Sequence, residues 1–403
     1  MILVTGGTGF LGREIVGRLL LSRPNERIGL LVRPAPGVSA ADRVARLLNE
    51  LFGQDDAAAY TNRVEVIAGD VAEDEFGIGS AEFQSLASRT DEIFHSAATT
   101  ALNEEISVAQ RINIGGTEQV LRLAKQANRS PLNSVRLNHI STAYVAGNSH
   151  AIVQPSTLDL SLSFRNAYER TKAEAEALVR DASQDISTCI FRPSIIVGDS
   201  VTGETSAFNV IYIPAKLIVK GFFLRFPALP HIPFDVVPVD YVADAIVYLS
   251  GLQHASGTCY HLSAGLGRES SPWEILEQLI STFNKYRRRG RSRLLMPTLV
   301  PAEVMTLAHS SFAVAMKVLE RMVCERLNVF RQTVPFIPYM LGNPRFDTTL
   351  TERAMGGTRP PLFANYAELL FRYCLETDWG KKPWTNPANL PAWRYRHGIG
   401  LLE

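Results

Sequence analysis

The sequence predicts an α/β protein in which a doubly wound, parallel β-sheet is followed by a smaller, mostly helical part. From residue 2 onward, short apolar runs typical of strands alternate with amphipathic stretches typical of helices. A glycine-rich turn separates the first of these strands from the first helix. Because strands joined through helices form right-handed βαβ units, they pair in parallel and are covered on both faces.

This alternation continues to about residue 200, so we predict one domain over residues 1–200. Its strands are expected at residues 2–5, 27–32, 64–69, 92–97, 135–141 and 188–191, and its helices at 11–22, 40–52, 108–128 and 167–182.

The pattern loosens over the second part of the chain, residues 201–403. Residues 236–265 contain a further predicted helix (242–252) and strand (258–263), and we expect them to return to the sheet. The remainder is expected to be largely helical, with helices starting at Pro272 and covering 303–327 and 366–376.

The composition excludes several classes of protein. The chain has 403 residues and a formal net charge of +1, so no long-range field draws it to nucleic acid or to an anionic membrane. Its four cysteines are scattered without metal-ligand spacing, so we predict no metal site and no disulfide framework. No signal peptide and no membrane-spanning apolar run is visible, and we expect a cytoplasmic protein.

The glycine-rich turn covers residues 5–12 and contains the spacing G-x-G-x-x-G. Glycines at these positions allow a tight turn and a close approach of the backbone to a pyrophosphate, which the amino end of the next helix attracts. The turn therefore predicts a Rossmann-type dinucleotide site. Its candidate residues are Thr5, Gly6, Gly7, Thr8, Gly9, Phe10, Leu11 and Gly12.

The end of the second strand indicates which dinucleotide binds. A site for NAD usually has an acidic residue there, which holds the ribose 2′-hydroxyl. This sequence instead has Arg33, and Arg13 at the start of the first helix could join it. Guanidinium groups pair well with phosphate. We therefore predict NADPH as the cofactor and domain 1–200 as an NADP(H)-binding domain.

Two further strand ends are expected to contact the cofactor. Asp70 and Val71 follow the third strand, where they could reach the adenine, with helix capping as the alternative role of Asp70. Ala97, at the end of the fourth strand, would let the cofactor lie close to the backbone. His95 is expected to be a packed residue without chemistry.

Tyr168 and Lys172 lie four residues apart and hence on one face of the predicted helix 167–182. A phenol with its ordinary pKa near 10 is a poor acid at neutral pH. We expect the ammonium of Lys172 to lower the pKa of Tyr168, so that the phenol can give and regain a proton at a carbonyl oxygen. Lys172 could also hold the ribose at the nicotinamide end of the cofactor.

Hydroxyl groups end the predicted strand 135–141. Side chains at this edge of a parallel sheet face the crevice where ligands bind. Thr142 could donate a hydrogen bond to a developing oxyanion. Ser141 is the alternative donor, and the sequence does not separate the two.

Together with Asn113, the glycine turn, the hydroxyl strand end and the Tyr-x-x-x-Lys helix resemble the extended short-chain dehydrogenases/reductases. The resemblance implies that Thr142, Tyr168 and Lys172 form the catalytic triad. It also implies that residues 192–198 form the strand that closes over the nicotinamide. Asn113, Ser141, Lys172, Pro193 and Ser194 are accordingly expected near the cofactor.

Within that family, three segments look most like the thioester reductases, namely the fatty acyl-CoA reductases and the terminal reductase domains of peptide and polyketide synthetases. They are the helix 40–52 with Arg43 and Arg46, residues 139–145, and residues 234–242. The resemblance implies NADPH-dependent reduction of an acyl thioester to an aldehyde, which some members reduce on to the alcohol. It adds Arg43 to the expected cofactor contacts and makes residues 201–403 the substrate-binding part.

The stretch 285–293 is the most basic in the chain. We expect Arg287, Arg288 and Arg289 to dock either the phosphates of CoA or an acidic carrier protein, with a solvated loop as the alternative.

Three other functions fit parts of the sequence. A sugar-nucleotide epimerase or dehydratase shares the triad, but it is expected to have an acid where this chain has Arg33. A hydroxysteroid-type alcohol dehydrogenase would oxidise an alcohol with NAD(P)+ and would need no surface for docking a carrier. A non-enzymatic NADP-binding scaffold is opposed by the complete triad. Chain length of the substrate and the choice between CoA and carrier stay open.

Overall fold

The computed structural model describes residues 1–128, 134–208, 210–223, 225–287, 290, 292–300 and 334–384. The predicted helical stretch 303–327 lies outside these residues, as do Arg288 and Arg289.

The centre of the fold is a seven-stranded sheet in the order β3-β2-β1-β4-β5-β7-β11, in which all neighbours are parallel. The strand order reverses between β1 and β4, which is where ligands bind in open sheets of this kind. The predicted Rossmann-type fold is thereby confirmed. The strands are β1 Ile2–Thr5, β2 Ile28–Val32, β3 Val64–Ala68, β4 Glu92–His95, β5 Arg136–Ile140, β7 Ser187–Pro193 and β11 Thr258–Leu262.

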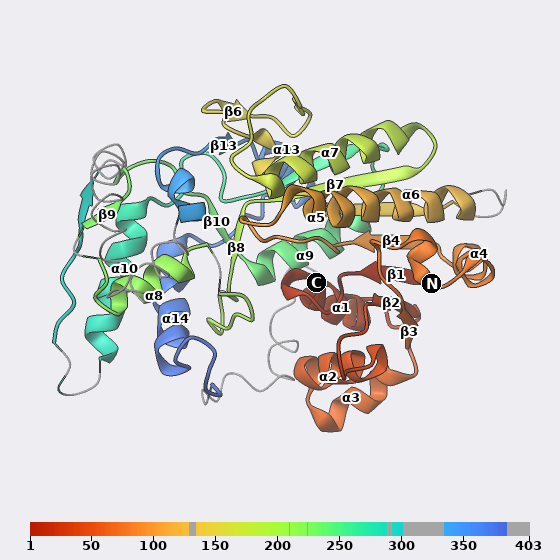
Figure 1. Ribbon diagram of the computed structural model, residues 1–403, viewed down its shortest axis with the longest axis horizontal. Helices are drawn as coiled ribbons and strands as arrows, with labels where there is room; N and C mark the ends of the chain where they lie inside the picture. The colour runs from red at the N-terminus through yellow and green to blue at the C-terminus, as the bar shows by residue number, and fades with distance from the viewer. Residues whose placement is uncertain are drawn as a thin grey trace, which may run out of the picture.

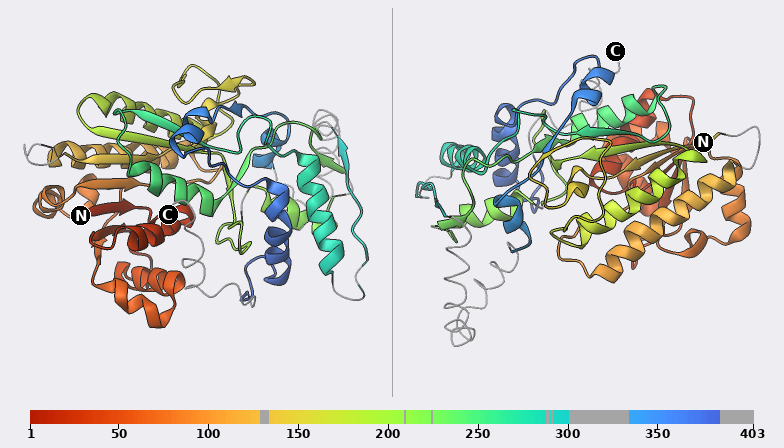
Figure 2. Two further views of the ribbon diagram at one scale, coloured as in Figure 1. Left: turned by 180° about the vertical axis from the view of Figure 1, so that it is seen from behind. Right: turned by 90° about the horizontal axis from the view of Figure 1, so that it is seen from above.

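Helices cover both faces of the sheet, as Figure 2 shows from above. One face packs against α1 (Phe10–Ser22), α2 (Ala40–Phe52) and α9 (Val239–Ser250). The other packs against α4 (Ser80–Ser88), α6 (Gly116–Ala127) and α7 (Ala167–Asp181). Because both faces are buried, every residue of β1 and β2 is buried, which explains why these strands appear as continuous apolar runs in the sequence.

The helix predicted over residues 108–128 is interrupted. It consists of α5 (Ile106–Ala109), a π-helical turn (Gln110–Gly115) and α6. Asn113 lies in the π-helical turn, where its side chain accepts a hydrogen bond from the Thr99 amide (2.9 Å) and donates one to Thr171 Oγ1 (2.9 Å). These bonds tie the turn to α7 and to the loop after β4.

The later segments gather at one end of the sheet, where β7 leads directly into β8 (Figure 1). α10 and α14 pack against each other there. Three short parallel pairs complete this part: β8 with β10, β9 with β12, and β6 with β13.

The remaining elements are short or belong to this later part. They are α3 Gln54–Thr61, β6 Ile152–Val153, β8 Ile195–Val197, α8 Tyr212–Val219, β9 Arg225–Pro227, β10 Val236–Pro238, α10 Pro272–Tyr286, β12 Thr298–Val300, β13 Arg345–Phe346, α13 Thr349–Ala354, α14 Phe363–Glu376, and 3-10 turns at Asp74–Gly77, Ala143–Ala146, Ala182–Gln184 and Val334–Met340. None of the helices in the described part of the chain has the length and apolar character needed to cross a bilayer.

Candidate active site

The glycine turn joins β1 to α1 and presses against the end of β4. Gly6 has a φ of +70°, and a Cβ added there would lie 2.6 Å from the amide nitrogen of Ala97. A Cβ on Gly12 would lie 2.1 Å from the carbonyl oxygen of Gly6. No side chain caps the start of α1 at Gly9. The turn is thus packed too tightly against backbone for side chains at Gly6 and Gly12, and this tight turn at the amino end of α1 fits the pyrophosphate of a dinucleotide.

The other predicted residues of the turn support this shape. The Thr5 hydroxyl lies 2.8 Å from His95 Nδ1 and accepts a hydrogen bond from the Ala97 amide at 3.3 Å. Leu11 is buried and Phe10 partly buried in the core beneath α1. A Cβ on Gly7 would contact Leu30 at 3.2 Å, so this glycine brings helix and strand together.

Two arginines lie beside the turn. Arg43 donates a hydrogen bond to Thr8 Oγ1 (2.9 Å) and another to the carbonyl oxygen of Arg33. Arg33 has a side chain that is 64% exposed and forms a 3.5 Å ion pair with Asp70. Arg13, predicted to join Arg33, instead pairs with Glu50 on α2 at 3.1 Å. The basic group at the end of β2 therefore consists of Arg33 and Arg43.

Asp70 and Val71 stabilise the turn after β3. Asp70 Oδ1 accepts a hydrogen bond from the Ala72 amide at 3.0 Å, in addition to its ion pair with Arg33. Val71 is buried, and its side chain lies 3.1 Å from the position of a Cβ on Gly116.

Helix α7 presents three functional side chains at four-residue spacing: Tyr168, Lys172 and Glu176. The carboxylate of Glu176 is buried and accepts hydrogen bonds from Arg192 Nε (2.9 Å) and Nη2 (2.7 Å) on β7. It also accepts a hydrogen bond from the Ser141 hydroxyl at 2.6 Å. These bonds hold α7 on the sheet and fix the direction of the face that carries Tyr168 and Lys172.

The two candidate hydroxyls at the end of β5 therefore have different surroundings. The Ser141 hydroxyl is bound to Glu176, whereas the Thr142 hydroxyl acts on the Tyr168 phenol by lowering its pKa. Thr142 Oγ1 also accepts a bond from the Tyr144 amide (3.2 Å) and lies 3.4 Å from the carbonyl oxygen of Pro193. Of the two hydroxyls, Ser141 is therefore occupied by Glu176, and Thr142 is the one that acts on the Tyr168 phenol.

Lys172 lies one turn beyond Tyr168 and is buried. Its Nζ donates a hydrogen bond to the carbonyl oxygen of Ile140 at 2.7 Å. Burial lowers the pKa of Lys172 to about 8, while the nearby Glu176 opposes this shift. His95 is a packed residue as predicted, because Thr5 and Thr117 hold its ring and burial lowers its pKa to about 3.

The expectation that Lys172 lowers the pKa of Tyr168 is wrong for this structure. Burial raises the pKa of Tyr168 to about 12, a shift that the Thr142 hydroxyl opposes and the Glu169 carboxylate reinforces. The physical reason is that desolvation of the phenolate outweighs the favourable interactions. At neutral pH the phenol is therefore protonated and available as a hydrogen-bond donor.

Sequence reasoning missed Glu176 and Asp235, which hold the predicted residues Ser141 and Ser194 in place. Ser194 donates a 2.5 Å hydrogen bond to the buried Asp235, which holds the segment after β7. Glu176 could have been found by extending the four-residue spacing from Tyr168 and Lys172 by one more step. Asp235 carries no comparable local signal.

A family model for an NAD-binding family, described as "Male sterility protein", matches residues 4–246. The chain belongs to this family. Its fold accordingly serves a nicotinamide dinucleotide, and the predicted resemblance is confirmed.

The relatives include two kinds of protein. Fatty acyl-CoA reductase 2 of Homo sapiens is 28% identical over 320 residues, which cover 70% of this chain and 61% of that protein. The nonribosomal peptide synthetase asaC of Aspergillus flavus is 28% identical over 294 residues, which cover 69% of this chain and 28% of that protein. The chain thus spans about three-fifths of the fatty acyl-CoA reductases it matches.

Among solved structures, the terminal R domain from the myxalamid PKS-NRPS biosynthetic pathway aligns with a TM-score of 0.74 and 25% sequence identity. The alignment covers 95% of this chain and 92% of that domain, so the likeness extends beyond the sheet into the later part.

Replacing Gly12 by alanine should abolish dinucleotide binding, because the added methyl group would overlap the Gly6 carbonyl oxygen. Quenching of protein fluorescence on titration with NADPH measures the affinity. Gly115→Ala is the matched control, since the nearest atom to its added Cβ lies 4.0 Å away, and it should bind as the wild type does. Wild-type affinity in Gly12→Ala would contradict the assignment of the turn.

Proposed function

We propose that the protein is an NADPH-dependent reductase of acyl thioesters, carried by CoA or by a carrier protein, which forms the aldehyde and in a second round the alcohol. The observation that carries this proposal is the position of α7: Lys172 Nζ is bound to the Ile140 carbonyl at the end of β5, next to Thr142, and Tyr168 lies one turn earlier on the same helix. The fatty acyl-CoA reductases and peptide synthetase among its relatives support the choice of a thioester.

NADPH, rather than NADH, is supported by the basic group at the end of β2. Arg33 and Arg43 occupy the place where an NAD site has a carboxylate, and Arg43 is fixed on Thr8 of the glycine turn. Two guanidinium groups there suit a 2′-phosphate. Lys172 would hold the ribose at the nicotinamide end, and the loop with Pro193 and Ser194 would cover it. When bound, the dinucleotide supplies the hydride.

The residues of the site then stabilise the charge that develops on the substrate. In this proposal the carbonyl oxygen accepts hydrogen bonds from the hydroxyls of Thr142 and Tyr168, and a donor to an oxyanion is worth a few kcal/mol, about 2.7–4. The high pKa of Tyr168 keeps its proton on the phenol, so that it donates without ionising.

The first reduction requires no proton transfer from Tyr168 or Thr142 to the carbonyl oxygen. Addition of hydride gives a tetrahedral oxyanion, and its collapse re-forms the carbonyl as an aldehyde while the carbon–sulfur bond breaks. The thiolate leaves with the electron pair and takes one proton from solvent. Tyr168 must give up its proton only in the second round, in which the alkoxide becomes an alcohol.

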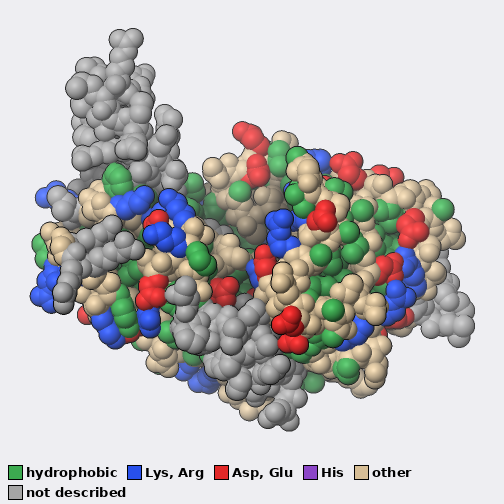
Figure 3. Space-filling model, turned by 90° about the horizontal axis from the view of Figure 1, so that it is seen from below, with side chains coloured by type: hydrophobic (Ala, Val, Ile, Leu, Met, Phe, Trp, Pro, Cys, Tyr) green, Lys and Arg blue, Asp and Glu red, His purple; other side chains and the backbone are tan. Residues whose placement is uncertain are grey.

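We further propose that an acidic carrier or the phosphates of CoA dock near the end of α10. Lys285 pairs with Glu368 at 2.6 Å, and Arg287 donates a hydrogen bond to the Asn284 carbonyl at 2.7 Å. On the face shown in Figure 3, acidic side chains lie among the basic ones, so this face offers no broad basic stripe for nucleic acid.

The same proposal assigns cofactor binding and substrate binding to different parts of the chain. Residues 1–200, together with 236–265, would bind the cofactor, and the rest of 201–403 would bind the acyl group. Cys189, Cys259 and Cys374 are free and buried, which supports a reducing compartment such as the cytoplasm.

Tyr168→Phe should lower kcat for an acyl-CoA or acyl-carrier thioester by roughly 100-fold or more, because it removes one oxyanion donor. Loss of NADPH absorbance measures turnover, and the variant should bind NADPH as tightly as the wild type. Tyr60→Phe is the control, since Tyr60 stacks on Phe52 in the α2–α3 pair away from the sheet edge. Undiminished turnover in Tyr168→Phe would refute the proposed centre.

Arg43→Ala should raise the KM for NADPH by roughly 10- to 100-fold, the size expected for one charged hydrogen bond, and leave the KM for NADH unchanged. Arg33→Ala should act in the same direction. Arg27→Ala is a matched control because its side chain is 66% exposed, against 64% for Arg33, and pairs with Glu65. Equal effects on both dinucleotides would argue against a 2′-phosphate site.

Reversing the charge in Arg287→Glu should raise the KM for the carrier-bound substrate and weaken its dependence on salt, because a basic group at the rim of an interface acts on association. The kcat for a small free aldehyde should stay unchanged. Arg111→Glu, on an exposed side chain that pairs with Glu73, is the control. A change confined to the free aldehyde would rule out docking at this place.

A further inference from the structure

A buried ion pair without an assigned role lies at the start of α7. The side chains of Arg165 and Glu169 are 3% and 0% exposed, and their charged atoms lie 3.6 Å apart. Burying two charges costs several kcal/mol for each ion unless further hydrogen bonds satisfy them. The contacts that satisfy this pair therefore show what it holds together.

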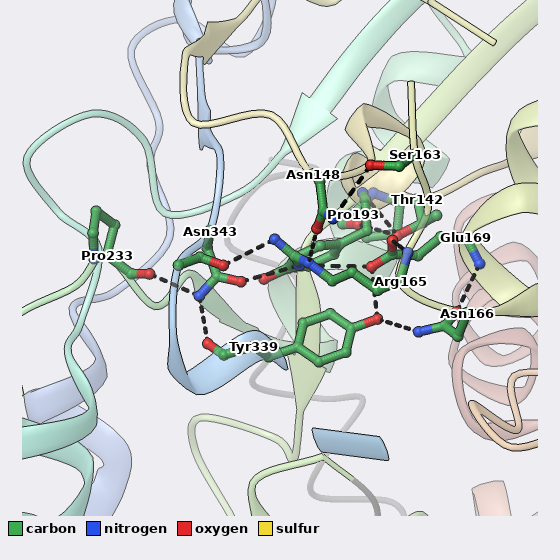
Figure 4. A network of polar contacts seen from close by, with 12 residues as sticks. Thr142, Asn148, Ser163, Arg165, Asn166, Glu169, Pro193, Pro233, Tyr339 and Asn343 are labelled. Atoms are coloured by element: carbon green, nitrogen blue, oxygen red, sulfur yellow. Dashed lines mark hydrogen bonds and ion pairs between the residues drawn. The ribbon is translucent and has the colours of Figure 1, made fainter. Parts of the chain in front are cut away.

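Arg165 joins segments that are distant in sequence (Figure 4). Its guanidinium donates to Asn148 Oδ1 (3.2 Å), to Asn343 Oδ1 (3.2 Å) and to the carbonyl oxygen of Gly342 (2.9 Å). Asn343 in turn donates to the carbonyl oxygen of Pro233 at 3.0 Å. One side chain thus fastens the loop after β5 and the segment after the 3-10 turn Val334–Met340 to the start of α7.

Glu169 completes the connection from the other side. Its carboxylate accepts hydrogen bonds from the Tyr339 hydroxyl (2.7 Å) and from the Arg165 amide (3.0 Å). The same Tyr339 hydroxyl accepts a bond from Asn166 Nδ2 at 2.8 Å. The first turn of α7, which contains Tyr168, is therefore held by a residue from the later part of the chain.

The network also reaches the second catalytic hydroxyl. The Arg165 guanidinium lies 4.8 Å from the ring centre of Tyr339 and 5.6 Å from that of Tyr144, and the two rings are 5.3 Å apart. The Tyr144 amide donates to Thr142 Oγ1. Thr142, through Tyr144, and Tyr168, through Glu169, are thus supported by the same two side chains, Arg165 and Tyr339.

We propose that Arg165 and Glu169, with Tyr339, are positioning residues that hold the hydroxyls of Thr142 and Tyr168 at the spacing needed to bind one carbonyl oxygen. This proposal rests on the proposed reduction of a carbonyl group. The planar fork of Arg165 suits the task, because it donates in fixed directions to several acceptors at once. Two donors must converge on one atom, and a misplacement of about 1 Å can cost roughly 100-fold in rate.

The test compares Arg165→Met with the wild type in steady-state reduction of an acyl-CoA by NADPH, protiated or deuterated at the transferred position. The kcat should fall by roughly 10- to 100-fold. The KM for NADPH should stay within about 2-fold of the wild-type value, as expected when the lost interaction is made only in the transition state. The isotope effect on kcat should increase, because the chemical step becomes slower. A purely structural role would reduce only the fraction of active enzyme and leave the isotope effect unchanged.

Two further variants keep the test decisive if Arg165→Met folds poorly. Tyr339→Phe keeps the ring and removes the bond to Glu169, and Arg165→Met combined with Glu169→Gln removes both buried charges. Both should show the same rise in isotope effect. Arg345→Met is the matched control, because Arg345 forms an ion pair with Glu269 at 2.8 Å in the same part of the chain, and its kcat and isotope effect should match the wild type.

Failure of this inference is distinct from failure of the proposed function. If the wild type reduces the thioester and folded Arg165→Met and Tyr339→Phe keep its kcat and isotope effect, the positioning role is overturned. If the wild type reduces no thioester, the proposed function fails. A crystal structure of Arg165→Met then decides whether Arg165 has the positioning role. A larger distance between the Thr142 and Tyr168 hydroxyls than in the wild type would support the positioning role, and an unchanged distance would overturn it.

Discussion

The arrangement of the site depends on the buried carboxylate of Glu176. It binds the Arg192 guanidinium on β7 and the Ser141 hydroxyl at the end of β5, so that α7 is tied to two neighbouring strands. Breaking a buried pair of this kind leaves an uncompensated charge and costs about 3–5 kcal/mol. Helix α7 therefore has one strongly favoured seat on the sheet, and this seat determines where Lys172 and Tyr168 lie, one and two turns earlier.

The same carboxylate separates two hydroxyls that are adjacent in sequence. Ser141 is bound to Glu176, which leaves Thr142 to pair with Tyr168 at the sheet edge. Next to them, His139 is buried and burial together with Lys172 lowers its pKa well below the ordinary value, so it is neutral. Between His139 and Lys172, the charged side chain at neutral pH is therefore Lys172, beside the place proposed for the ribose.

The parts of the fold that follow from local patterns could be predicted from the sequence. Strands covered on both faces are continuous apolar runs, and a turn that tolerates no Cβ must be glycine, as Gly6 and Gly12 are. The π-helical turn around Asn113 could not be predicted, because one extra residue in a helical turn hardly changes the apolar period. The spacing of Tyr168 and Lys172 correctly predicted a shared helix, but the pKa of Tyr168 depends on burial, which no spacing reveals.

The contacts that position the site were beyond the sequence for a different reason. Tyr339 and Glu169 are 170 residues apart, and no local pattern links them. Yet Glu169, Lys172 and Glu176 make α7 a helix with several buried charges, where apolar side chains would often be at least as stable. What these charged side chains provide is direction. Each accepts or donates hydrogen bonds in fixed directions, and these bonds form in only one orientation of the helix. A helix packed only by apolar contacts could rotate or slide slightly at little cost, and two hydroxyls from different elements would then no longer converge on one oxygen atom.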